Sequence, residues 1–221
     1  MSPTPHPFHD KTAGVLFLAM AGLTVLAMLH HPTIGAHDPG EAIGEALHET
    51  PVNNLVHGSL IAWMIVSAWG ATRLAARASG SRIDPGFGAL VYAFGAMGMI
   101  SAAIVSGFAV PDLAVRLEGA PPEEAGAFLI QLRGFLALNQ AFAKFGALAS
   151  GAGIFLLSAA LAHRPGIARL SGFGGLAIGA LVCGLMLSGF RLNVAGMTHV
   201  TMLLGLWYAL AGVVLLSRPR G

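Results

Sequence analysis

Titratable side chains recur at a common depth along four apolar stretches of this sequence. His30, His57, Lys144 and His199 each stand 19 or 20 residues from a Lys or Arg at the other end of the same stretch. At 1.5 Å per helical residue this spacing is about 28–30 Å, close to the thickness of a bilayer's hydrocarbon core. Ionisable groups inside membrane spans are costly and usually mark function. The spacing therefore predicts a polar layer near one membrane boundary, which Asp112 joins from a fifth stretch.

These residue types suit a cofactor or a metal ion. Neutral imidazoles on separate helices are the usual axial ligands of b-type haem, so His57 with His199, or His30 with His57, is a candidate pair. The same three histidines with Asp112 are candidate ligands of a transition metal. Lys144 would then face a haem propionate, a quinone oxygen or a lipid phosphate. The sequence therefore predicts a cofactor-binding or redox-associated protein, with haem b or a transition metal as the cofactor.

Other function classes fit the same polar layer. A small transporter, or a protein that binds a lipid or solute, could use these groups in a vestibule open to the outside. A structural subunit could bury them against another membrane protein or a second copy of itself. The sequence has no Gly-x-Ser-x-Gly, Cys-x-x-Cys or Gly-Lys-Ser/Thr motif, so it singles out no nucleophile and no phosphate loop. Whether the protein is an enzyme stays open.

The composition indicates that lipid surrounds the helices. Hydrophobic residues make up 55% of the 221 residues and charged residues 10%, against roughly 25% charged in soluble domains. Apolar stretches this long must be helices, because lipid offers no partners to backbone polar groups. We predict a single all-α transmembrane domain over residues 1–221, an up-down bundle of six spans at about 12–31, 54–77, 86–111, 134–162, 171–190 and 195–217.

The distribution of positive charge predicts the orientation. Eight of the twelve Lys and Arg residues flank one side of the predicted spans, which places both termini in the cytoplasm. We expect a multi-pass protein of a bacterial inner membrane whose main partner is the lipid bilayer. Nucleic acid is not expected as a partner, because the net charge is only +2 and the Arg residues form no basic face. The single cysteine, Cys183, excludes an intrachain disulfide.

The connections on the outer side contain two further helix signals. Glu41, Glu45 and Glu49 recur at helical spacing after Asp38, which predicts a short amphipathic helix on the outer membrane surface. Pro122 is followed by two glutamates, which favours a fourth spanning helix that begins there and projects beyond the bilayer.

Repetition and small residues give expectations about packing. His57 lies 30 residues before Phe87, and Lys144 lies 29 before Phe173, so spans 2–3 and 4–5 are candidate parallel hairpin repeats. Gly175 and Gly179 have the Gly-x-x-x-Gly spacing of close helix contacts. The scattered methionines are interpreted as core-filling side chains: Met20, Met28, Met64, Met97 and Met99. The cytoplasmic half of the spans is expected to be small and apolar.

Overall fold

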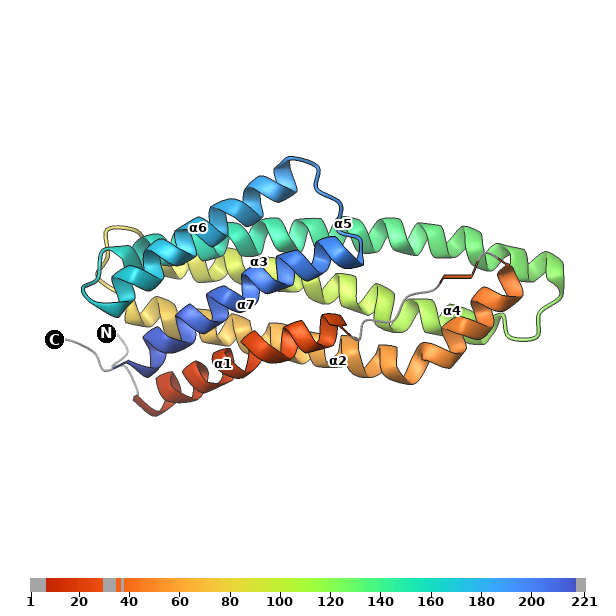
Figure 1. Ribbon diagram of the computed structural model, residues 1–221, viewed down its shortest axis with the longest axis horizontal. Coiled ribbons are helices and arrows are strands. Elements are labelled where there is room, and N and C mark those ends of the chain that lie inside the picture. The colour runs from red at the N-terminus through yellow and green to blue at the C-terminus, as the bar shows by residue number, and fades with distance from the viewer. Residues whose placement is uncertain (1–6, 30–34, 37, 218–221) are drawn as a thin grey trace.

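The computed structural model describes residues 7–29, 35, 36 and 38–217, and within them all regular structure is helical (Figure 1). The elements follow one another as α1 (Pro7–Leu29), α2 (Pro39–Arg77), α3 (Pro85–Ile104), the π-helical turn η1 (Val105–Ala109), α4 (Val110–Arg116), α5 (Pro122–Ala162), α6 (Ile167–Leu187) and α7 (Val194–Leu216).

Six helices of the described chain are long and apolar enough to cross a membrane, which confirms the predicted helical membrane bundle. The third of them is the continuous helix Pro85–Arg116, formed by α3, η1 and α4. Large apolar side chains such as Leu55, Leu170 and Leu187 are exposed on the outside of the bundle, as lipid contact requires.

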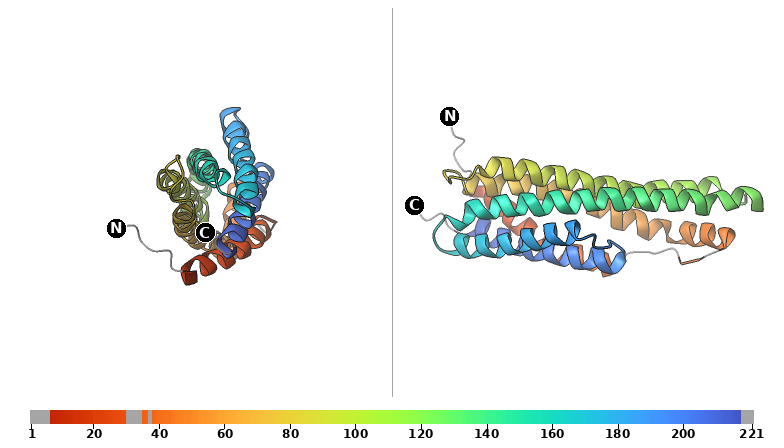
Figure 2. Two further views of the ribbon diagram at one scale, coloured as in Figure 1. Left: turned by 90° about the vertical axis from the view of Figure 1, so that its left-hand side faces the viewer. Right: turned by 90° about the horizontal axis from the view of Figure 1, so that it is seen from above.

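The helices have two lengths, and this shapes the molecule. α2 has 39 residues, α5 has 41 and Pro85–Arg116 has 32, whereas α1, α6 and α7 have 21 to 23. A 40-residue helix is about 60 Å long, and a 22-residue helix about 33 Å. The three long helices therefore extend beyond the short ones at what we call the projecting end (Figure 2). We call the opposite end, where α1 begins and α7 ends, the terminal end.

The two helix starts predicted on the outer side have different outcomes. α5 begins at Pro122 as expected, with Glu123 and Glu124 in its first turn. The prediction of a separate surface helix after Asp38 is wrong, because α2 runs from Pro39 through Pro51 to Arg77 without a break. Other helices, rather than lipid, cover the apolar face of this segment.

The projecting end has a small core of its own that explains the continuous α2. Ala42, Ile43 and Ala46 of α2 are buried against α4 and α5, where Ala114 and Phe128 are fully buried. Helix-on-helix burial of this kind stabilises the segment in water. Asp38 caps it, accepting hydrogen bonds from the backbone N–H groups of the second and third residues of the helix.

Glycines let the spans approach closely, as the Gly-x-x-x-Gly spacing predicts for α6. A Cβ added at Gly179 would lie 2.7 Å from the carbonyl oxygen of Gly151 in α5, and one added at Gly175 would overlap the Ser158 hydroxyl. The hairpin repeat stays a prediction. α2–α3 and α5–α6 are both helical hairpins, but α6 ends after 21 residues.

Charged side chains of the terminal end pair with one another and with the backbone. Asp10 is 4% exposed and accepts hydrogen bonds from Nε and Nη2 of Arg73 at 3.0 and 2.8 Å. Arg77 donates to the carbonyl oxygens of Val214 and Ser217 at the end of α7. Together these contacts join α1, α2 and α7 at the terminal end.

A buried tyrosine pair lies deeper in the bundle. The hydroxyls of Tyr92 in α3 and Tyr208 in α7 are 2.8 Å apart and fully enclosed. Trp207 packs against both rings, with centroids 5.3 and 5.6 Å away, and Phe17 of α1 packs against Trp207 and Tyr208. The hydroxyls are bonded to each other, so the interior can bury them at little cost.

Candidate functional site

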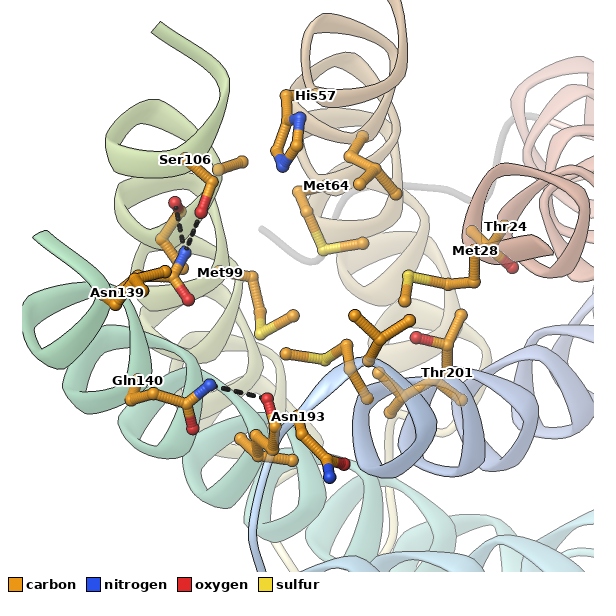
Figure 3. A pocket seen from close by; sticks show the side chains of 18 of the residues that line it. Thr24, Met28, His57, Met64, Met99, Ser106, Asn139, Gln140, Asn193 and Thr201 are labelled. Carbon is orange, nitrogen blue, oxygen red and sulfur yellow. Dashed lines mark hydrogen bonds between the residues drawn. The ribbon is translucent and has the colours of Figure 1, made fainter. Parts of the chain in front are cut away.

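A cavity of about 300 Å³ lies between α1, α2, α3, α5 and α7 (Figure 3). Its wall includes His57 and Met64 of α2, which stand 20 and 13 residues before Arg77. At 1.5 Å per residue these positions are about 30 and 20 Å from the terminal end. The cavity therefore occupies the half of the membrane nearer the projecting end, where the sequence predicts the polar layer.

The cavity reaches the protein surface at one side and is closed at the other. Leu136 of α5 and Asn193, just before α7, belong to the wall and are exposed. At the other side lies Tyr208, whose ring is held in the fully buried cluster with Tyr92 and Trp207. This aromatic cluster lies between the cavity and the terminal end.

His57 is a buried polar group of the wall. Its side chain is 3% exposed, points into the cavity, and places Nδ1 2.9 Å from the carbonyl oxygen of Asn53 (Figure 3). Gly107 of η1 lies directly against His57, because a Cβ there would overlap the histidine's own Cβ.

The π-helical turn η1 supplies further polar character. A π-turn frees backbone carbonyls from the regular ladder, and such turns are frequent at functional sites. Asn53 Nδ2 donates to the carbonyl oxygens of Ser106 and Gly107, at 2.9 and 3.3 Å. Asn139 Nδ2 donates to the Ala102 carbonyl and the Ser106 hydroxyl, at 2.8 and 2.6 Å. The asparagines therefore hold α2 and α5 against the irregular turn.

Two amides of α5 face the cavity. The donor of Asn139 is engaged by α3 and η1, and Gln140 Nε2 donates to the Leu192 carbonyl oxygen at 2.6 Å. Each amide keeps its carbonyl oxygen as an acceptor. Thr24, Thr201 and Tyr208 also belong to the wall. The polar part of the wall is therefore made of neutral groups.

Four methionines converge on the cavity from four helices. Met28 of α1, Met64 of α2, Met99 of α3 and Met197 of α7 all line it, and we call them the methionine set. The thioethers of Met28, Met64 and Met99 point into the same space (Figure 3). The sequence interpretation as scattered core-filling residues misses this convergence. Their spacing follows no period, so no local signal could have revealed it.

Of the described residues, none that lines the cavity carries a formal charge. This matters for the ligand, because a buried ion without a counter-charge is strongly disfavoured and the penalty rises steeply with its charge. A phosphate or a hard divalent cation would lack compensation here. The cavity suits a ligand that is uncharged or carries a single, weakly hydrated charge.

Only part of the predicted polar layer reaches the cavity. His57 lines it, but His199 is exposed on α7, where its Nδ1 lies 2.6 Å from the carbonyl oxygen of Ala195. Met197 and Thr201 belong to the cavity wall. His199 is two residues from each of them, and at 100° per residue it lies on the opposite face of α7. The pair His57 and His199 is thus not brought together for a haem. His30 lies outside the described residues.

The charged candidates also lie elsewhere. Lys144 is half-buried on α5 but is not part of the cavity wall. Asp112 is exposed and forms an ion pair with Arg116 one turn along α4, at 2.8 Å. The part of the chain that the structure describes contains no group of three His, Cys, Asp or Glu side chains placed to hold a metal. The predicted metal site of histidines with Asp112 is therefore not found there.

No family model, curated protein or solved structure was found to match this chain.

Proposed function

We propose that this membrane protein binds a small ligand of low charge in the cavity. The observation that carries the proposal is the convergence of imidazole, amide, hydroxyl and thioether groups from five helices on an uncharged space of about 300 Å³. Binding sites are typically concave, mostly apolar and provided with a few well-placed polar groups, and they range from about 300 to 1,000 Å³. The proposal makes the protein a solute-binding or transport-related one.

The ligand enters from the projecting end. Exposed Asn193 and Leu136 border the cavity on that side, while Tyr208 and its aromatic neighbours close the other. The positive charges predict that the terminal end lies in the cytoplasm, so the ligand comes from outside the cell. In this proposal the protein is in an outward-facing conformation, in which its cavity can bind a solute from outside the cell.

Solute binding is better supported than the two sequence-based alternatives that need charge or paired histidines. A b-type haem would need a second axial ligand, and His199 is turned away from His57. An anionic headgroup would need a cation, and Lys144 is not in the wall. The neutral wall of the cavity therefore favours neither a b-type haem nor an anionic headgroup as the ligand.

Cysteine labelling tests access to the cavity. In a Cys183→Ala background, Thr201→Cys places a thiol in the wall, and Ser158→Cys places one at a buried helix contact outside it. We expect a small, membrane-impermeant methanethiosulfonate reagent to modify Thr201→Cys from outside the cell and to leave Ser158→Cys unmodified. Equal resistance of both thiols in folded protein would contradict an accessible cavity.

Ligand-induced stabilisation tests binding. Duroquinone represents uncharged ligands and Ag⁺ represents soft monovalent ones. We expect one of them to raise the thermal midpoint of the purified protein, because a ligand that binds only the folded state stabilises it. Ala103→Leu fills part of the cavity and should remove the shift. If neither probe shifts the midpoint, or if Ala103→Leu keeps the full shift, the proposal is wrong.

A further inference from the structure

We propose that the ligand is a soft monovalent metal ion, Cu(I), held in the cavity by the thioethers of the methionine set. This inference rests on the proposed function, because it identifies the occupant of the same cavity. The chain has nine methionines, and four of them line this one space. Apolar packing alone has no need of sulfur from four separate helices, since leucine fills the same volume.

The four methionines of the set lie on four different helices, so they share one space only when the bundle assembles. Met28, Met64, Met99 and Met197 come from α1, α2, α3 and α7. The sulfur atoms of Met28, Met64 and Met99 approach the cavity from different sides (Figure 3). Met28 and Met64 are 5% and 7% exposed, so both side chains are buried within the bundle. Methionine has flexible torsions, so the four sulfurs can adjust around an ion.

The soft character of the thioether ligands decides which metal ion the cavity can bind. Thioethers are soft ligands that select Cu(I), whereas Mg²⁺ and Ca²⁺ require oxygen ligands, chiefly carboxylates. None of the described residues in the wall is a carboxylate. Cys183 also lies outside the wall. A thiolate site for Zn²⁺ is therefore not formed by these residues.

The charge of the ion supports the same choice. The Born penalty for burial scales with the square of the charge, so a monovalent ion pays about a quarter of the penalty of a divalent one of equal size. The neutral wall offers no compensation for the second charge. Binding involves no electron transfer, and copper enters and stays as Cu(I).

His57 belongs to the entry side of this site. It lies seven residues before Met64 on α2, about 10 Å nearer the projecting end. Its imidazole points into the cavity above Met64 (Figure 3). An imidazole is a good copper ligand, so His57 can receive the ion at the entrance and pass it to the thioethers.

Competition for Cu(I) tests the inference on the purified full-length protein. Under anaerobic conditions with bicinchoninate as competitor, we expect one Cu(I) per chain. The double variant Met64→Leu with Met99→Leu should weaken the affinity by at least about tenfold, as loss of metal-site groups typically does. Leucine conserves the volume of methionine, so the fold is retained. Undiminished affinity in the double variant, or no Cu(I) held against the competitor, would overturn the inference.

Two further methionines provide matched controls. Met97 lies two residues from Met99 but is 59% exposed, and Met20 is 2% exposed in the main core, outside the cavity. Met97→Leu and Met20→Leu should keep the affinity of the natural protein. X-ray absorption of the copper-loaded protein should show sulfur neighbours that the double variant loses. Purely nitrogen and oxygen neighbours would contradict a thioether site.

The outcome for copper can be separated from the outcome for solute binding. If Cu(I) and Ag⁺ fail to bind while duroquinone stabilises the protein and Ala103→Leu removes the effect, the metal assignment is wrong and the cavity remains a ligand site. If all three probes fail, both proposals are wrong. Cu(I) binding that depends on the methionine set supports both.

Discussion

Asp10 and Asp112 carry the same carboxylate in very different surroundings. Asp10 is 4% exposed and receives two hydrogen bonds from Arg73, with Arg77 close by at 3.9 Å. The side chains of Asp112 and Arg116 are 62% and 74% exposed. Burial removes competing water, so the first ion pair joins α1 to α2, whereas the second lies within α4 and is exposed to solvent.

At the residue scale we therefore predict unequal effects of two substitutions. Asp10→Asn leaves Arg73 and Arg77 without a counter-charge and should destabilise the protein by about 3 kcal/mol. Asp112→Asn should change the stability by less than about 0.5 kcal/mol. Thermal unfolding midpoints of the two purified variants check this. A similar midpoint for both variants would show that the buried pair contributes little.

The polar character of the cavity comes from an irregularity in a helix. The π-helical turn η1 joins α3 to α4, and its residues Ser106 and Gly107 contact α2 and α5. Gly107 permits this contact, since its missing side chain makes room for His57. A regular helix through this segment would carry its carbonyls in its own ladder and would not need Asn53 and Asn139.

At the element scale we predict that Gly107→Ala disturbs the cavity. The new Cβ would overlap the Cβ of His57, and such overpacking typically costs about 1–3 kcal/mol. Gly184→Ala on α6 is the matched control, because a Cβ there meets nothing within 4 Å. Thermal midpoints and duroquinone or Ag⁺ binding check both variants. An unchanged midpoint and unchanged binding in Gly107→Ala would refute the role of this contact.

The whole molecule has one long end with its own small core. Ala42, Ile43, Ala114 and Phe128 hold the extensions of α2, α4 and α5 together beyond the short helices (Figure 2). The glutamates of this end, such as Glu41 and Glu124, are exposed to the surroundings. Acidic side chains at this density require water, which places the projecting end outside the hydrocarbon core.

At the scale of the whole molecule we predict the orientation. In the Cys183→Ala background, Glu124→Cys at the projecting end should react with an impermeant thiol reagent in intact cells. Ser79→Cys, in the exposed turn after α2, should react only after the membrane is permeabilised. The excess of Lys and Arg at the terminal end is the physical reason. The reverse pattern would show that the ligand cavity opens to the cytoplasm.

The sequence by itself determined the six helices and the start of α5 at Pro122. These features depend on local properties, namely apolar length and proline in a first turn, which act without knowledge of the rest of the chain. It also placed His57 and His199 at one depth, because depth follows from the number of residues along a helix.

Only the tertiary structure decided which residues share the cavity. Rotation about each helix axis is set by packing, so His57 points inward while His199 points outward at a similar depth. The small core of the projecting end likewise turned an expected surface helix into part of α2. The methionine set comes from four segments far apart in the sequence, and no period links them. Convergence of this kind is a property of helix packing, which sums contacts over the whole bundle.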